Sequence, residues 1–343
     1  MLSRDLPDTL HVLGFSLRKR LLLRRFVPQA KLIPVRAGGA VPRGATVVAW
    51  GTADVPGLPR DAHLVRAEDG FLRSVGLGAE LCRPRSWVFD RSALHFDATR
   101  PSDLETLLQA QSFAGPELVR ARALRERLVA AGVTKYGVGR SHWQRPEARR
   151  VLLVTGQVET DASLRLGAPG RRTNLELLQA VRAENPHAHL VYKPHPDVAA
   201  GLRLAGPSEH DAIRHCDSVV ADVGLQALLP HVDGVHVLTS LSGFEALLRG
   251  VPVTCHGMPF YAGWGLTDDR LALARRTRRL SLDELVAGAL IAYPSYVSTA
   301  TGALSTPEQV LEELIARQGT RTPATRLVQT LRRGAIRLAL GAS

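Results

Sequence analysis

The fold class is decided by RRVLLVTGQ at residues 149–157, TNLELLQAVRAENP at 173–186 and AHLVYKPHP at 188–196. The first and third segments are short apolar runs that predict buried strands, and the second has the apolar spacing of a helix. Thr173 and Glu176 have the spacing of a capping box at the start of that helix. Strands that alternate with helices predict a parallel, doubly wound sheet, so the fold class is α/β.

The same alternation continues on both sides of these segments. Downstream, strands are expected at residues 218–221 and in VHVLTS; upstream, KLIPV, TVVAWG and HLVRAED are β-branched runs between Gly and Pro turns. A chain of 343 residues exceeds a typical single core, which favours two domains. We predict a basic amphipathic segment at 1–30, a Rossmann-like domain at 31–140, a second Rossmann-like domain at 149–300, and C-terminal helices with a basic amphipathic tail at 301–343.

Composition is that of a soluble globular protein, with 45% hydrophobic and 22% charged residues. The absence of a long apolar run and of a signal-like N-terminus leads us to expect a cytoplasmic chain. Cys82, Cys216 and Cys255 lack the spacing of a zinc site. We therefore expect them to be reduced and buried.

The net charge of +12 implies an anionic partner. Nucleic acid is disfavoured, because the basic runs lack interleaved aromatic residues and no nucleic-acid-binding signature is present. Residues 14–28 and 325–340 mix leucines with arginines and resemble basic amphipathic helices that could lie on an anionic bilayer. The alternative, that each apolar stripe packs on the body of the protein, stays open.

Polar side chains follow several predicted strands. In GQVETDAS, residues 156–163, Glu159 and Asp161 come directly after an apolar strand. Two carboxylates at this spacing can serve as acid, base or nucleophile in glycosyl chemistry. The alternative is that they only cap a helix or a turn.

YKPHPDV, residues 192–198, contains one of only four lysines in the chain, against forty arginines. The prolines beside Lys193 and His195 fix the backbone, so both side chains could bind a phosphate or a carboxylate. A histidine that merely caps the turn is the alternative.

Residues 239–269, TSLSGFEALLRGVPVTCHGMPFYAGWGLTDD, predict a turn and a helix N-terminus. Backbone N–H groups and the helix dipole at Ser240, Ser242 and Gly243 would suit a phosphate. Glu245 could accept hydrogen bonds from ribose hydroxyls or cap the helix.

A fourth loop, AEDGFLRSVGLG, follows a strand of the first half of the chain. Its Glu68, Asp69 and Arg73 are expected to face a cleft between the two domains.

Together GQVETDAS, YKPHPDV, TSLSGFEALLRG, PFYAGWGLTDD, EDGFLRSVGLG and FDATRPSDLE resemble the capsule polysaccharide β-Kdo transferases, which build the Kdo linker on a lipid during bacterial capsule export. The resemblance covers about residues 30–300. It implies a GT-B-like fold with two Rossmann-like domains facing a central cleft, the first for the acceptor and the second for the CMP-sugar donor. It also implies CMP-β-Kdo as donor, a lysophosphatidylglycerol glycolipid or its Kdo chain as acceptor, and retention of configuration through a covalent enzyme adduct.

The resemblance also assigns roles to residues. Glu159 matches the acid/base, and we favour Asp161 as nucleophile; Asp233 matches a family position and is the reserve, although its predicted strand places it at the wrong end. The donor-binding residues are Gln157, Lys193, His195, Pro196, Ser240, Ser242, Gly243 and Glu245. The sugar or acceptor pocket is predicted to contain Glu68, Asp69, Arg73, Tyr261 and Trp264, although the loop of Tyr261 and Trp264 could instead be a packed structural lid.

The chain carries one transferase module where the family commonly carries two, so it could work beside a partner chain or other capsule assembly proteins. No active-site metal is expected, since the family needs none and no Asp-x-Asp motif is present. The expected location is the cytoplasmic face of the inner membrane, as a peripheral protein. Two alternatives remain, a non-catalytic glycan-binding or capsule assembly component and a transferase that uses another nucleotide sugar.

Overall fold

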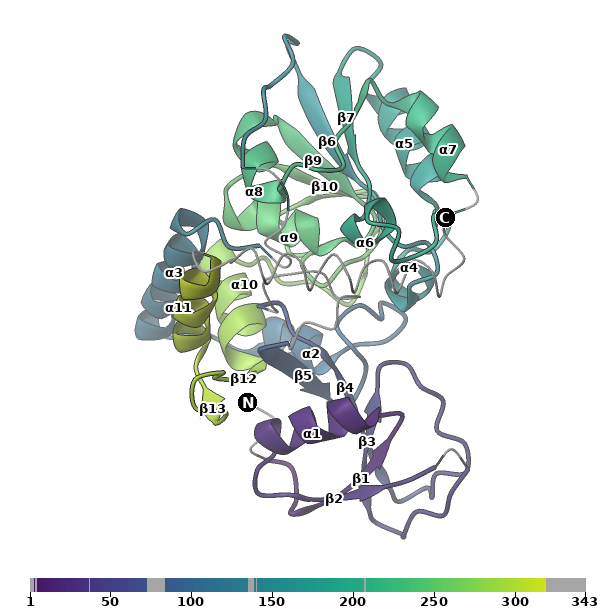
Figure 1. The fold of residues 1–343 in the computed structure, drawn as a ribbon, viewed down its shortest axis with the longest axis vertical. Helices are drawn as coiled ribbons and strands as arrows, with labels where there is room; N and C mark the ends of the chain where they lie inside the picture. The colour runs from purple at the N-terminus through teal and green to yellow at the C-terminus, as the bar shows by residue number, and fades with distance from the viewer. Residues whose placement is uncertain are drawn as a thin grey trace. The chain divides into compact units, whose positions relative to one another are not determined.

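The computed structural model describes residues 3, 5–36, 38–72, 84–134, 139, 141–206 and 208–318. The chain divides into two compact units (Figure 1). Unit 1 consists of Met1–Arg73, Pro84–Leu124 and Asp283–Glu313, and unit 2 of Ser74–Arg83, Arg125–Leu282 and Leu314–Ser343. In the described part of the chain, no helix is long and apolar enough to cross a membrane.

Unit 1 contains a seven-stranded sheet with the order β13-β12-β5-β4-β3-β1-β2. The strands are β1 (Thr9–Leu13), β2 (Lys31–Pro34), β3 (Thr46–Trp50), β4 (His63–Asp69), β5 (Ser86–Asp90), β12 (Ser295–Val297) and β13 (Leu304–Ser305). Strands β1 to β4 pair in parallel, as a Rossmann-like domain requires, whereas β5, β12 and β13 pair antiparallel at one edge.

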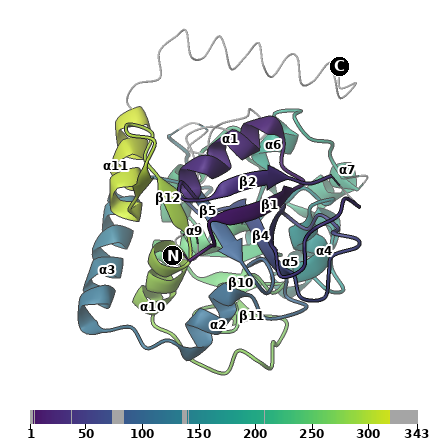
Figure 2. The same ribbon diagram turned by 90° about the horizontal axis from the view of Figure 1, so that it is seen from below.

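The basic N-terminal segment is part of this sheet and not a separate region, which corrects the boundary predicted at residue 30. Strand β1 lies between β3 and β2, and helix α1 (Leu17–Phe26) packs on the sheet (Figure 2). Phe26 stacks on Trp87 with ring centroids 4.7 Å apart. One face of α1 is therefore core, while Leu17 and Leu21 on the other face are 66% and 55% exposed.

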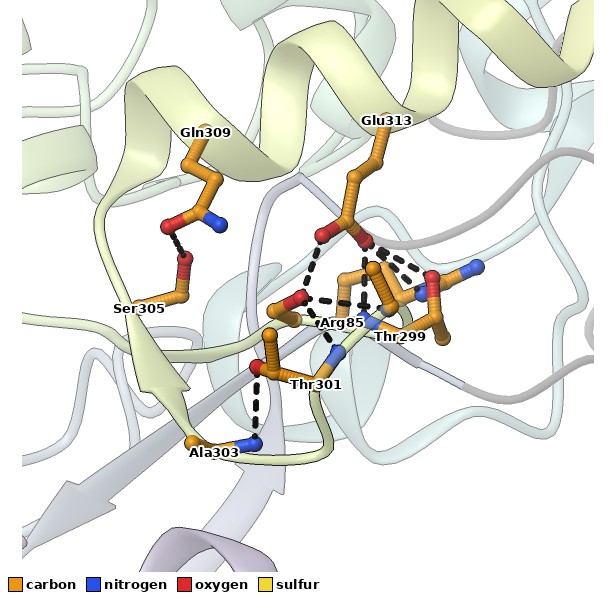
Figure 3. A network of polar contacts seen from close by, with 9 residues as sticks. Arg85, Thr299, Thr301, Ala303, Ser305, Gln309 and Glu313 are labelled. Atoms are coloured by element: carbon orange, nitrogen blue, oxygen red, sulfur yellow. Dashed lines mark hydrogen bonds and ion pairs between the residues drawn. The ribbon is translucent and has the colours of Figure 1, made fainter.

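The C-terminal part of the described chain returns to unit 1, so the boundary predicted at residue 300 is also wrong. It forms α10 (Leu282–Val286), the π-helix η4 (Ala287–Ala292), β12, β13 and α11 (Pro307–Gln318). Figure 3 shows Glu313 of α11 directed at Thr299 and Arg85, with Glu313 Oε2 2.7 Å from Thr299 Oγ1 and 3.3 Å from Arg85 Nη1. The predicted amphipathic tail at 325–340 lies outside the described residues.

Two helices of unit 1 come from the middle of the chain, α2 (Asp103–Ala110) and α3 (Gly115–Ala130), the last turns of α3 belonging to unit 2. Ser102 caps α2 by accepting a hydrogen bond from the Glu105 N–H. Helix α3 lies beside α11, where Arg120 Nε is 2.7 Å from Glu308 Oε1 (Figures 1 and 2).

Unit 2 contains a six-stranded sheet with the order β11-β10-β9-β6-β7-β8 (Figure 1). Its strands are β6 (Val151–Thr155), β7 (His189–Lys193), β8 (Ser218–Val219), β9 (Gly234–Val237), β10 (Val253–Cys255) and β11 (Asp268–Asp269). All neighbours pair in parallel, which confirms the predicted doubly wound sheet. The chain adds β7 and β8 on one side of β6 and β9 to β11 on the other, so the order reverses between β6 and β9.

Short helices connect these strands: α4 (Ala162–Gly167), α5 (Asn174–Glu184), α6 (Pro196–Ala199), α7 (Glu209–Ala212), η2 (Ile213–His215), α8 (Leu225–Leu228), η3 (Leu229–His231) and α9 (Leu241–Leu248). The capping box predicted for α5 is present, with both hydrogen bonds between Thr173 and Glu176. Apolar residues of α5 pack on β6 and β7 and fix the polar N-terminus of α5 at the carboxyl end of the sheet. Cys255 is a buried free thiol and Cys216 a partly buried one; Cys82 lies outside the described residues.

Candidate functional site

The carboxyl ends of β6 and β9 form the topological switch point of unit 2. Gln157 after β6 and Thr239 after β9 join the two loops, because Thr239 N donates to Gln157 Oε1 at 2.8 Å and Gln157 Nε2 donates to Thr239 Oγ1 at 3.0 Å. Ligands of open α/β sheets bind outside the strand ends at this reversal. Gln157 is therefore a buried clamp at the floor of the candidate site.

The serine turn predicted for phosphate binding lies at this switch point. Ser240 caps α9 by accepting a hydrogen bond from Ser242 N at 3.2 Å. The Ser240 hydroxyl donates to Ser242 Oγ at 3.0 Å, which leaves the Ser242 hydroxyl hydrogen to donate to another acceptor. Gly243 has to be glycine here, because a Cβ would lie 2.3 Å from the Tyr261 hydroxyl oxygen. The positive end of the α9 dipole adds attraction for an anion.

Lys193 is the last residue of β7 and His195 comes two residues later, beside the end of β6. Lys193 is half-buried and donates to the Val223 carbonyl at 2.6 Å; burial lowers the pKa of its ammonium group to about 8, against the opposing charge of Asp222. His195 caps α6, its Nδ1 accepting from Asp197 N at 3.2 Å. The neutral ring therefore carries its hydrogen on Nε2 as a donor. Pro196 occupies the first turn, where a missing N–H is tolerated.

Glu159 lies at the carboxyl end of β6 and at the N-terminus of α5. Its Oε1 accepts from Asn174 N at 2.8 Å, and its Oε2 packs against Gly206, where a Cβ would come within 2.0 Å. Burial raises the pKa of this carboxyl, Asn174 opposes the rise, and the charges of Glu209 and Glu176 add to it. Glu159 thus caps a helix, which was the alternative interpretation of the sequence. It also has the raised pKa that suits an acid/base.

Asp161 is the N-cap residue of α4, but its side chain makes no capping hydrogen bond. Its Oδ1 lies 2.6 Å from Arg203 Nη2, and both side chains are 43% exposed. Sequence reasoning missed Arg203, because nothing distinguishes it among forty arginines. It also missed Asn174, which reads in the sequence as the first residue of an ordinary helix.

Asp233 lies at the opposite end of the sheet, so the structure does not bring it together with Glu159 and Asp161. Its Oδ2 accepts from Val151 N at 2.7 Å, at the start of β6, and lies 2.7 Å from Arg145 Nη2. Asp233 therefore lies at the wrong end of its strand for a role beside Glu159, as its predicted strand indicated. Its carboxylate instead connects the amino end of β6 to the start of β9.

Tyr261 and Trp264 do not line an open pocket, which corrects their predicted role. Both side chains are fully buried. The Tyr261 hydroxyl donates to the Ser240 carbonyl, and Trp264 Nε1 donates to the Phe260 carbonyl at 2.8 Å. The aromatic loop is the packed structural lid of the alternative reading, and it supports the serine turn from behind. Glu245, in α9, is also buried.

The residues predicted in the first half of the chain lie in unit 1. Glu68 and Asp69 are half-buried at the carboxyl end of β4, where Asp69 Oδ1 accepts from Trp87 Nε1 at 3.2 Å. Lys19 Nζ lies 3.5 Å from the centroid of the Trp50 ring, which ends the adjacent strand β3. Arg73 lies outside the described residues.

Two solved structures of β-Kdo transferase modules are similar to this chain. Both come from KpsC of Thermosulfurimonas dismutans. The 2,7 transferase is 37% identical with a TM-score of 0.75, and the match covers 91% of this chain and 100% of that one. The 2,4 transferase is 32% identical with a TM-score of 0.78, over 91% and 99% of the two chains. The fold class is therefore that of the GT-B-like glycosyltransferases.

Sequence comparison gives the family. The model of the capsule polysaccharide biosynthesis proteins matches residues 118–302. The capsule polysaccharide modification protein LipA of Neisseria meningitidis serogroup A is 42% identical over 322 residues, 90% of this chain and 46% of LipA. The lipopolysaccharide-processing protein LpsZ of Rhizobium meliloti is 42% identical over 277 residues, 78% of this chain and 63% of LpsZ. This chain belongs to the capsule polysaccharide biosynthesis family, and it spans about half the length of the LipA protein it matches.

Proposed function

We propose that this chain is a retaining glycosyltransferase that transfers Kdo from CMP-β-Kdo to a lipid-linked acceptor, lysophosphatidylglycerol or its Kdo chain, in capsule linker synthesis. The observation that carries the proposal is a common placement: the Glu159 carboxyl, whose pKa is raised, Lys193, His195 and the α9 N-terminus all lie at the carboxyl ends of the adjacent parallel strands β6, β7 and β9. The likeness to solved β-Kdo transferase modules over 91% of the chain supports it.

The donor phosphate would be bound by Lys193 Nζ, His195 Nε2, the Ser242 hydroxyl and the α9 dipole. Pro196, Gln157, Gly243 and the Ser240 cap shape this site, and Glu245 is our candidate for the ribose hydroxyls. CMP carries a single phosphate, so one cation and a helix N-terminus suffice to balance its charge. Transfer is therefore expected to need no metal and to continue when EDTA is added after the donor has been generated.

Retention would follow from double displacement. The Asp161 carboxylate attacks the anomeric carbon of Kdo, the bond to the phosphate oxygen breaks, and CMP leaves with the bonding electrons. Glu159 then takes the proton of an acceptor hydroxyl, whose oxygen attacks the same carbon and displaces Asp161. Arg203 would orient Asp161 for the first attack.

The proposal is tested with freshly generated CMP-Kdo and a synthetic Kdo-lipid acceptor. We expect a product heavier by one or more Kdo residues, whose linkage shows whether the chain acts like the 2,7 or the 2,4 module. The absence of transfer where a KpsC module is active would refute the proposal. Turnover with a UDP-sugar would support another donor, and glycan binding without turnover a non-catalytic assembly role.

The nucleophile is tested separately by mass spectrometry of the intact Glu159→Gln protein. Without a base the second displacement stalls, so a Kdo adduct should accumulate on Asp161. An adduct mapped to another carboxylate would show that Asp161 is not the nucleophile.

We also propose that the protein binds the cytoplasmic face of the inner membrane through α1. Its exposed Leu17 and Leu21 lie beside exposed Arg18 and Arg24, a combination that suits an anionic bilayer. The double variant Leu17→Ser/Leu21→Ser should co-sediment less with anionic vesicles, as should a chain lacking residues 320–343. The control is Leu204→Ser in unit 2, which removes a leucine of similar exposure, 69%. Equal loss in the control would contradict a role for α1.

A further inference from the structure

A second carboxylate, Glu209, lies close to Glu159 and was not singled out in the sequence. It is the first residue of α7, and both of its carboxylate oxygens accept hydrogen bonds. Tyr192 OH donates to Oε1 at 2.6 Å, and Asn174 Nδ2 donates to Oε2 at 2.8 Å. Tyr192 is fully buried and Asn174 nearly so. Both donors are neutral, so these contacts hold the carboxylate in place without compensating its charge.

Asn174 connects this carboxylate to Glu159. Its backbone N–H donates to Glu159 Oε1 at 2.8 Å while its side chain donates to Glu209. The same side chain exchanges two hydrogen bonds with the Gln157 backbone, at 2.9 and 3.0 Å. The buried Asn174 therefore contacts both carboxylates and Gln157. These contacts fix the spacing between Glu159 and Glu209.

The electrostatic consequence follows from like charges in a partly buried site. The charges that raise the pKa of Glu159 are those of Glu209 from α7 and Glu176 from α5, and the charge of Glu159 in turn raises the pKa of Tyr192 in β7. The Asp161–Arg203 pair joins the loop of Glu159 to the segment that follows α6. A neighbouring carboxylate favours the protonated form of Glu159. Among these groups, Glu209 is the one that the Asn174 side chain ties directly to the Glu159 site.

We propose that Glu209 is a positioning residue whose charge, held in place by Tyr192 and Asn174, sets the protonation of Glu159 and thereby the pH range of transfer. The inference rests on the proposed acid/base role of Glu159. A base with a higher pKa accepts the acceptor proton more readily, provided that it is still ionised at the working pH. The charge of Glu209 thus adjusts the base without touching the substrate.

The test uses Glu209→Gln, with Glu209→Asp as the variant that keeps the charge. Above its pKa Glu159 is ionised and acts as a base, so transfer should rise with pH through that pKa. Removal of the Glu209 charge lowers the pKa of Glu159, so the acidic limb of kcat/KM should move to lower pH by about 0.5 to 1 unit. In Glu209→Asp the limb should stay near its wild-type position. Glu184→Gln, which removes a carboxylate from the far end of α5, is the matched control and should not move the limb.

A second readout does not depend on turnover. Carbon-13 labelling of glutamate carboxyls allows NMR titration, and the signal missing in Glu159→Gln identifies Glu159. The titration midpoint of Glu159 should fall in Glu209→Gln by the same amount as the acidic limb of kcat/KM. It should be unchanged in Glu184→Gln. An unchanged midpoint, with a thermal unfolding curve showing a folded variant, would mean that Glu209 only holds α7 and would overturn the inference. If the wild-type protein transfers no Kdo although the midpoint shifts, the proposed function fails and the electrostatic coupling stands.

Discussion

Charged side chains at the two ends of the six-stranded sheet have different hydrogen-bond and charge partners. At the amino end, Asp217 and Asp233 each accept from a backbone N–H in the first two residues of a neighbouring strand and also pair with an arginine. Asp217 binds Leu190 and Arg182, and Asp233 binds Val151 and Arg145. At the carboxyl end, the Glu159 carboxyl has neutral partners and negative neighbours, and Lys193 has a carbonyl oxygen.

The pKa directions express the same difference. Arg145 and the Val151 N–H hold the pKa of Asp233 below its usual value; for Asp217 burial acts upward, but the Leu190 N–H and Arg182 bring the net shift down. At the other end burial raises the pKa of Glu159 and lowers that of Lys193. Paired charges at the amino end hold the strands in register. At the carboxyl end Asp161 is also paired, with Arg203, but burial destabilises the charges of Glu159 and Lys193, so these two groups are poised to take a ligand or a proton.

The sharpest way to break this comparison is to neutralise one aspartate at each end. Asp161→Asn should lower kcat by about 10³-fold or more, since an amide cannot act as nucleophile. Asp233→Asn should keep kcat within about threefold of wild type, because a group at the amino end does not touch the reacting atoms. The assay is Kdo transfer at saturating donor. The reverse pattern, with activity retained in Asp161→Asn and lost in a folded Asp233→Asn, would contradict the assignment of function to the carboxyl end.

Lys193 offers the next largest effect. Lys193→Met should weaken CMP binding by about 10- to 100-fold, the loss of one charge-assisted hydrogen bond. Because the ammonium group of the free protein loses its proton near pH 8, wild-type affinity should fall as pH rises above about 8, and the variant should lack this fall. Calorimetric titration with CMP at pH 7 and 9.5 measures both. Lys31→Met on β2, in unit 1, is the control; equal weakening there would indicate a nonspecific charge effect.

The sequence was sufficient for the parallel sheet of unit 2, because its apolar strands and the Thr173 capping box are local signals that tertiary packing reinforces. It was insufficient for the unit boundaries. Strand β1 and the segment from Asp283 to Glu313 join unit 1 through pairings with residues far away in the chain, and no local pattern records them.

The candidate site was predicted in the same uneven way. Residues at or shortly after strand ends, such as Lys193 and Glu159, could be placed at the carboxyl end of the sheet from strand direction alone. The aromatic residues Tyr261 and Trp264 could not, because a buried ring and a pocket-lining ring have the same letter in a glycine-rich loop. Glu209 was missed because its link to Glu159 runs through the Asn174 side chain, across 35 residues of sequence.

The smallest expected effect concerns stability at the amino end. Asp233→Asn and Asp217→Asn should each lower the free energy of unfolding at pH 7 by about 1 kcal/mol. Most of this loss is expected because the backbone hydrogen bond loses its charged acceptor, since half-exposed ion pairs contribute little. Asp268→Asn is the control, because its carboxylate meets the Arg270 side chain at 2.7 Å and is 62% exposed. Substitution of Asp268 should lower the free energy of unfolding by less than about 0.5 kcal/mol.

The pH dependence of that effect follows from the lowered pKa values. A carboxylate with a depressed folded pKa stabilises the protein above its unfolded pKa of about 3.8, and this contribution is lost as pH falls through the folded value. The difference in free energy of unfolding between each variant and the wild type should therefore be largest at pH 7 and decrease at acidic pH. Urea unfolding at pH 7 and pH 3 measures it. A difference that persists undiminished at pH 3 would mean that the aspartates act by shape and not by charge, and the contrast between the two ends of the sheet would lose its electrostatic basis.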